Sequence, residues 1–207
     1  MMLTQAIGLF LVFATYVAHA EESSDSAGKK PLPEENPIYF PEQHISDVAE
    51  VNETWVVTRR NVPPTGYNCH SATKVSGEGD TYTYLFSVRN ETTKQYIKWN
   101  VTMTAVTTGN HTVPNAVQYT YLNPQLYPEA KPQISKLMTE DRLGCALFVT
   151  EVPVEVPKLG VQIYRACILV QTKSTAGGQI PATCSHAYRD DCPHYPQEDE
   201  PWKAGCE

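Results

Sequence analysis

Two short segments near the C-terminal end carry residue types that can bind a metal ion. They read Cys184-Ser185-His186 and Cys192-Pro193-His194. Thiolate sulfur and imidazole nitrogen are usual ligands of structural zinc, so the two pairs form a candidate zinc site. The alternative is that the cysteines form disulfides and the histidines lie on the surface, which suits a secreted chain better. We therefore expect no metal site and no cofactor.

Several features predict that the chain is secreted. Residues 1–20 contain no charged side chain and end at Ala18-His19-Ala20, which is typical of a cleaved signal peptide. No later apolar stretch is long enough to span a membrane. In an oxidising compartment the six cysteines most simply form three disulfides. Four Asn-x-Thr sequons also predict N-glycosylation, at Asn52, Asn90, Asn100 and Asn110.

The sequence lacks the motifs that would support catalysis. It contains no His-Glu-x-x-His, no Gly-x-Ser-x-Gly, no phosphate-binding loop and no EF-hand pattern. Its 16 basic and 23 acidic residues give a net charge of −7, which argues against binding to a nucleic-acid backbone. We predict a protein that is not an enzyme and does not bind nucleic acid.

The remaining chain divides into a tail and a β-rich domain. Residues 21–37 are acidic and rich in proline, which predicts a flexible tail ahead of one domain over residues 38–207. Short helices are expected over Pro41–Glu50 and Ala182–Asp190. Alternating and β-branched segments, separated by Pro, Gly and Asn, predict eight antiparallel strands. These strands are expected over Thr54–Arg60, Tyr67–Val75, Thr81–Val88, Tyr96–Thr107, Ala116–Leu122, Gln133–Thr139, Cys145–Val152 and Val161–Thr172.

Eight meandering strands leave no unpaired edge if they close into a barrel, and such a barrel can hold one small ligand. If Asn100 carries a glycan, its side chain faces solvent. The alternation of side chains along a strand then turns the apolar set inward, namely Ile97, Trp99, Val101, Met103 and Ala105. With the aromatic face of the preceding strand also inside, the ligand-binding residues are expected to be Tyr84, Phe86, Trp99, Val101, Met103, Tyr119 and Ile168.

Several short segments follow one another in a characteristic order along the domain. They are Trp55-Val56-Val57, Tyr82-Thr83-Tyr84-Leu85-Phe86, Gly144-Cys145-Ala146-Leu147-Phe148-Val149, Cys167-Ile168-Leu169-Val170, Ile180-Pro181-Ala182-Thr183-Cys184 and Ala204-Gly205-Cys206. Their order and spacing resemble those of the tick salivary lipocalins, the histamine-binding protein family. The resemblance implies an all-β fold, the eight-stranded up-and-down lipocalin barrel with short N-terminal and C-terminal helices.

The resemblance also implies a disulfide pattern. Carried over position by position, it pairs Cys69 with Cys206, Cys145 with Cys184, and Cys167 with Cys192. The sequence by itself allows fifteen pairings of six cysteines.

One departure from the family bears on the ligand. Members that bind histamine place acidic side chains inside the barrel, one of them in a Glu-Leu-Trp segment where this chain has Ile168-Leu169-Val170. No acidic residue falls in the middle of an expected strand, and a buried cation needs a carboxylate or an aromatic cage. A biogenic amine such as histamine and a lipid such as a leukotriene, fatty acid or sterol therefore both stay open.

Three further groups of side chains have two interpretations each. Trp55 either closes the narrow end of the barrel by packing or contacts the ligand. The tyrosine cluster either lines the cavity and binds a polar head group or pairs across strands on the outside, and it comprises Tyr82, Tyr84, Tyr119 and Tyr121. The strand cations are either solvated or, if one faces inward, suited to a carboxylate ligand, and they are Arg59, Lys98 and Arg165.

Together these observations predict a secreted, monomeric glycoprotein that sequesters a small host mediator at a feeding site. The alternative is a protein-binding immunomodulator that engages a host complement or immune-cell protein and uses the barrel only as a scaffold. An open cavity of several hundred Å³ would favour sequestration, whereas a filled barrel would favour the scaffold.

Overall fold

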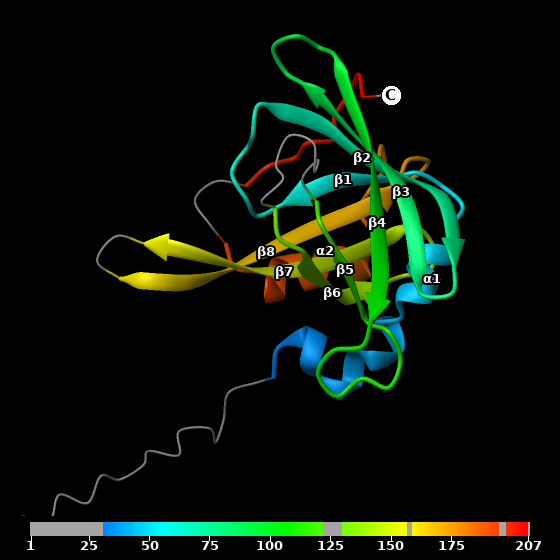
Figure 1. Ribbon diagram of the computed structural model, residues 1–207, viewed down its shortest axis with the longest axis vertical. Coiled ribbons are helices and arrows are strands. Elements are labelled where there is room, and N and C mark those ends of the chain that lie inside the picture. The colour runs from blue at the N-terminus through cyan, green and yellow to red at the C-terminus, as the bar shows by residue number, and fades with distance from the viewer. Residues whose placement is uncertain (1–30, 122–129, 157–158, 195–197, 207) are drawn as a thin grey trace, which may run out of the picture. The chain divides into compact units, whose positions relative to one another are not determined.

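The computed structural model describes residues 31–121, 130–156, 159–194 and 198–206. Its eight strands form a closed antiparallel barrel, because each strand pairs with its sequence neighbours and β1 also pairs with β8 (Figure 1). The predicted eight-stranded barrel is confirmed. The strands are β1 (Trp55–Arg60), β2 (Tyr67–Glu78), β3 (Thr81–Asn90), β4 (Tyr96–Val106), β5 (Ala116–Tyr119), β6 (Gln133–Glu140), β7 (Cys145–Val156) and β8 (Gly160–Thr172).

The strand ends differ from the expected ones where hairpin partners extend the pairing. β2 continues to Glu78, which pairs with Thr81 across a turn that contains Gly79 at a φ of +56°. β7 continues to Val156, which pairs with Gly160 of β8. In the opposite sense, β5 ends at Tyr119 and not at Leu122, which lies outside the described residues. Pairing between partners, and not strand propensity alone, sets these boundaries.

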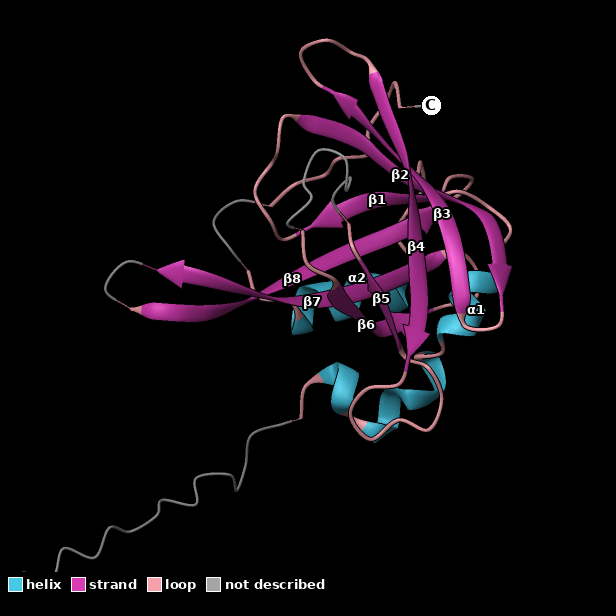
Figure 2. Ribbon diagram, viewed as in Figure 1, coloured by secondary structure: helices cyan, strands magenta, loops and turns pink. Residues whose placement is uncertain are grey.

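Helical structure flanks the barrel (Figure 2). The helix expected over Pro41–Glu50 is α-helical only over α1 (Ile45–Glu50), and a 3-10 helix, η2 (Pro37–Glu42), precedes it. Pro41 lacks the N–H that a continuous α-helical ladder needs, which favours the separate 3-10 segment. The C-terminal helix α2 (Ala182–Asp191) lies within one residue of its expected position. None of the helices in the described parts of the chain is long and apolar enough to cross a membrane.

The expectation of a flexible tail was wrong for the last residues of that segment. A 3-10 helix, η1 (Pro33–Glu35), lies there, and the side chain of Glu34 is 0% exposed. Both carboxylate oxygens of Glu34 accept hydrogen bonds from the guanidinium of Arg165, at 2.7 and 3.1 Å. A buried ion pair therefore joins this segment to β8. Residues 21–30 of the expected tail and the expected signal peptide lie outside the described residues.

Two apolar layers lie on opposite faces of the barrel wall. Inside the barrel, Leu137 belongs to a cluster with the aromatic residues of β3 and β5. Outside it, the next residue, Met138, packs with Leu147, Leu169 and Tyr188 of α2. Adjacent residues of β6 therefore belong to different apolar clusters, one inside the barrel and one outside it, as the alternation of side chains requires.

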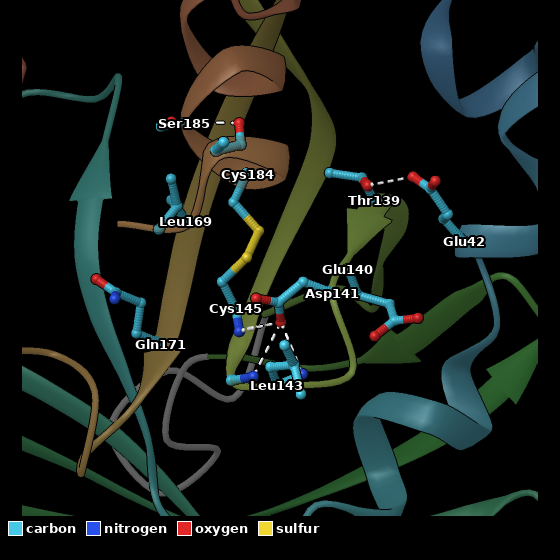
Figure 3. Close-up of a disulfide and its surroundings, with 12 residues drawn as sticks. Glu42, Thr139, Glu140, Asp141, Leu143, Cys145, Leu169, Gln171, Cys184 and Ser185 are labelled. Carbon is cyan, nitrogen blue, oxygen red and sulfur yellow. Dashed lines mark hydrogen bonds between the residues drawn. A yellow bond between two sulfur atoms is a disulfide. The ribbon is translucent and has the colours of Figure 1, made fainter. Parts of the chain in front are cut away.

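Three disulfides join distant parts of the described chain, and they are the pairs that the family resemblance implied. Cys145–Cys184 fastens the start of β7 to α2 (Figure 3), and Cys167–Cys192 fastens β8 to the end of α2. Cys69–Cys206 ties β2 to the C-terminal segment. The cysteines of the candidate zinc site are therefore bonded to other cysteines, and the described residues contain no group of three or more potential metal ligands.

The β7–β8 hairpin projects beyond the rest of the sheet (Figure 1). β1 pairs with β8 only from Ile168 onward. Next to that point the side chain of Asn61 forms hydrogen bonds to the backbone of β8 in place of a paired strand. Its Oδ1 accepts from the N–H of Cys167 at 2.7 Å, and its Nδ2 donates to the carbonyl of Arg165 at 3.1 Å. The hairpin beyond Asn61 exposes the apolar side chains of Val161 and Ile163, at 65% and 59%.

Candidate functional site

A cavity of about 140 Å³ lies inside the barrel. The apolar residues Ile45, Val48 and Ala49 of α1 line one end, beside Trp55 at the start of β1. Trp55 is buried and also lines the cavity, so its packing role and a contact with a ligand are compatible. The Nζ of Lys74 donates to the carbonyl of Ala49 at 2.5 Å and holds α1 against β2. The cavity is smaller than several hundred Å³, yet the barrel is not filled.

Five of the seven expected ligand-binding residues line this cavity, namely Tyr84, Phe86, Met103, Tyr119 and Ile168. Trp99 and Val101 belong to the same interior cluster but do not line the cavity. The ring of Trp99 packs edge-on against Phe86, with 5.9 Å between ring centroids, and its Nε1 donates to the carbonyl of Tyr121 at 3.0 Å. These contacts hold Trp99 in the wall.

The side-chain alternation on β4 follows the expectation from Asn100 with one exception. Asn100 is exposed, while Val101 and Ala105 are buried and Met103 lines the cavity. Ile97 is 37% exposed and does not line the cavity, which corrects its expected position.

The tyrosine cluster lies on the inner face of the barrel. All four of its members line the cavity. The hydroxyl of Tyr119 lies 3.1 Å from Ser135 Oγ, which in turn lies 2.6 Å from Thr150 Oγ1. Burial raises the pKa of both Tyr84 and Tyr121 to about 12, so these hydroxyls are neutral at physiological pH.

His70 also lines the cavity, and no motif or pattern in the sequence indicated it as a site residue. Alternation from Ala72, which pairs with the inward-facing Phe86, places His70 on the inner face of β2. The strand is irregular just before His70, where Cys69 has a φ of +53° and the pairing with β3 shifts between Asn68 and Ser71. Ser71 also lines the cavity, although alternation assigns it to the other face.

His70 is held in its neutral form. Its Nε2 lies 3.2 Å from the carbonyl oxygen of Tyr67, and its Nδ1 lies 3.3 Å from the hydroxyl of Tyr121. Burial, with a smaller effect from the charge of Arg60, lowers the pKa of His70 from 6.5 to about 4. The carboxylate of Asp199, which is paired with Arg60, acts weakly in the opposite direction.

We expect the stability of the protein to fall as the pH drops from 6.5 towards 4. The unfolded chain takes up a proton on His70 near pH 6.5, whereas the folded protein resists it until about pH 4. This contribution is complete above pH 6.5 and amounts to about 3 kcal/mol, at roughly 1.4 kcal/mol per pKa unit. Urea unfolding at several pH values measures it. The variant His70→Gln should lose that part of the pH dependence, and an unchanged slope would contradict the assignment.

The described residues that line the cavity include no aspartate or glutamate. The expectation that no acidic residue falls in the middle of a strand was wrong, because Glu151 lies in the middle of β7 and Glu155 lies near its end. Both side chains are exposed, and neither lines the cavity.

None of the strand cations lines the cavity. Arg165 pairs with Glu34, Arg59 pairs with Glu200 at 2.9 Å, and Lys98 is exposed. The described residues that line the cavity therefore carry no charged side chain, since His70, the basic residue among them, is neutral.

The four sequons occupy different surroundings. Asn52, Asn100 and Asn110 are exposed, while Asn90 is half-buried. The Oδ1 of Asn90 accepts hydrogen bonds from the N–H groups of Thr92 and Thr93, each at 2.9 Å. Glycosylation at these four positions remains a prediction.

The fold is shared with lipocalins of known structure. Lobster apocrustacyanin A1 superposes with a TM-score of 0.54 at 9% identity, covering 78% of this chain and 83% of that chain. Japanin from Rhipicephalus appendiculatus, solved bound to cholesterol, superposes with a TM-score of 0.51 at 13% identity, covering 86% of this chain and 100% of that chain. At these identities the likeness shows the fold alone.

Sequence comparison with protein families gives a more specific result. A search of curated proteins found no significant match. Residues 33–207, which span nearly the whole described domain, match the family described as tick histamine binding protein. The protein therefore belongs to the tick histamine-binding protein family.

Proposed function

We propose that this protein is secreted and sequesters a small host mediator in the barrel cavity without catalysing a reaction. The observation that carries the proposal is the largely apolar cavity, which is lined by residues of the barrel strands and of α1. Burial of apolar ligand surface there would supply about 25 cal/mol per Å². The family membership and the cholesterol bound to japanin, which has the same fold, support a small ligand. The three disulfides fit an extracellular protein.

The size of the cavity favours a compact ligand. An apolar cavity of ~150 Å³ holds benzene, whereas sites for drug-sized ligands measure roughly 300–1,000 Å³. At about 140 Å³, this cavity suits a one-ring compound better than a sterol or a leukotriene. The amine and lipid classes are separated by calorimetric titration with histamine, a fatty acid, a leukotriene and a sterol. Native mass spectrometry of protein from a eukaryotic secretion host would identify a co-purified ligand.

Histamine should bind weakly, because no carboxylate among the described cavity residues offsets the desolvation of its ammonium group. The variant Ile168→Glu places an acid in the cavity at the position where histamine-binding relatives carry one. We expect it to raise the affinity for histamine by about tenfold or more, which corresponds to ~1.4 kcal/mol. Ile168→Gln is the matched uncharged control. Tight histamine binding by the wild-type protein would show that a carboxylate reaches the ligand.

The exposed β7–β8 hairpin supports a second candidate function, the binding of a host protein. Val161 and Ile163 lie on the part of β8 that β1 does not pair with, and such an edge can accept an extended strand of another protein. If neither the titrations nor native mass spectrometry detect a small ligand, this function is favoured over sequestration.

A further inference from the structure

Among the polar groups of the cavity, His70 and Tyr121 form a hydrogen-bonded chain whose direction is fixed. The chain begins at the carbonyl oxygen of Tyr67, which can only accept a hydrogen bond. The Nε2 of His70 must therefore carry the hydrogen in that contact. A neutral imidazole has one N–H, so Nδ1 is left as an acceptor.

The hydroxyl hydrogen of Tyr121 then has a defined partner. Because Nδ1 of His70 accepts, the O–H of Tyr121 donates to it across 3.3 Å. The phenol oxygen has used its only hydrogen and retains lone pairs. Tyr121 lines the cavity, so it presents a hydrogen-bond acceptor to a ligand.

The surroundings of His70 keep its imidazole neutral and so preserve the direction of these hydrogen bonds. Burial and the guanidinium of Arg60 hold the pKa of His70 well below physiological pH, and Arg60 is itself paired with Asp199. A ligand that offered only an acceptor would meet the lone pairs of Tyr121 and gain no hydrogen bond from that residue. A ligand with a full positive charge would find no carboxylate among the described cavity residues.

Resting on the proposed small-ligand function, we infer that the cavity selects compact, uncharged ligands that carry an O–H or N–H donor, which binds the hydroxyl oxygen of Tyr121. Tyr121 and His70 are thus specificity-determining residues. The ligand class includes phenols and other one-ring compounds with a neutral donor group. Ethers, ketones and esters of the same size gain no hydrogen bond at Tyr121.

Two matched pairs of probes test the direction of the hydrogen bond by calorimetric titration. Phenol differs from toluene by a donor group, and anisole differs from ethylbenzene by an acceptor that cannot donate. In Tyr121→Phe we expect the affinity for phenol relative to toluene to fall tenfold or more. The affinity for anisole relative to ethylbenzene should change by less than about twofold. Tyr84→Phe removes another hydroxyl from the cavity wall and should change neither ratio.

A second variant gives a readout that a purely structural role would not produce. His70→Leu removes the acceptor of the Tyr121 hydrogen, which is then free to turn to the ligand. We expect the affinity for anisole relative to ethylbenzene to rise in this variant. The inference would be overturned if Tyr121→Phe lowered the affinity for anisole relative to ethylbenzene. It would also be overturned if Tyr84→Phe, and not Tyr121→Phe, lost phenol binding.

The same titrations separate the inference from the proposed function. If neither toluene nor phenol binds the wild-type protein, the proposed function and the inference both fail. If toluene binds but Tyr121→Phe leaves the phenol ratio unchanged, only the inference about Tyr121 fails.

Discussion

Replacing both Cys69 and Cys206 with alanine should lower the free energy of unfolding by about 5 kcal/mol. This disulfide closes a loop with a sequence separation of 137 residues, which is the longest of the three. In the chain-entropy account, a cross-link stabilises more as the loop lengthens, because it restricts the unfolded chain more. Guanidinium chloride unfolding under non-reducing conditions measures the difference.

The matched control is the pair Cys167→Ala and Cys192→Ala. Its separation is 25 residues, and the same account gives about 3.5 kcal/mol. An equal or larger loss in this control would show that contacts in the folded state, such as those under α2, outweigh loop length.

Glu34→Gln should destabilise the protein by about 3 kcal/mol. The carboxylate is fully buried and forms two hydrogen bonds to Arg165, whose side chain is 16% exposed. Removal of one partner from a buried ion pair costs about 3–5 kcal/mol, because the other charge stays in a poorly solvated place. Glu151, which lies 3.6 Å from Arg165, compensates in part and places the effect at the lower end. Thermal unfolding with the disulfides intact measures it.

The neighbouring residue provides a control for Glu34. Glu35 pairs with Lys136, and about a quarter of each side chain is exposed. Glu35→Gln should cost less than about 1 kcal/mol, because solvent screens a pair of this kind. If the two variants lost the same stability, burial of the Glu34–Arg165 pair would not be the cause.

The local sequence determined the number, order and approximate place of the strands. Alternating side chains between proline, glycine and asparagine breaks define a strand without reference to its partner, and the observed elements follow them. The sequon at Asn100 likewise indicated which face of β4 is inside, because a glycosylated side chain faces solvent and alternation is a property of one strand. The disulfide pairs required the family resemblance in addition, since spacing alone does not select among them.

Only the tertiary structure decided the features that depend on residues far apart in the chain. The burial of Glu34 depends on Arg165, which lies 131 positions later, so composition assigned its segment to a tail. The inward position of His70 depends on the pairing of β2 with β3, which sets Ala72, on the same face of β2, opposite the interior Phe86. The hydrogen-bonding character of the cavity wall then depends on the contact between His70 of β2 and Tyr121, which follows the end of β5. Local patterns report how one strand presents its side chains, whereas the cavity is made by contacts between strands, and these form only when the barrel closes.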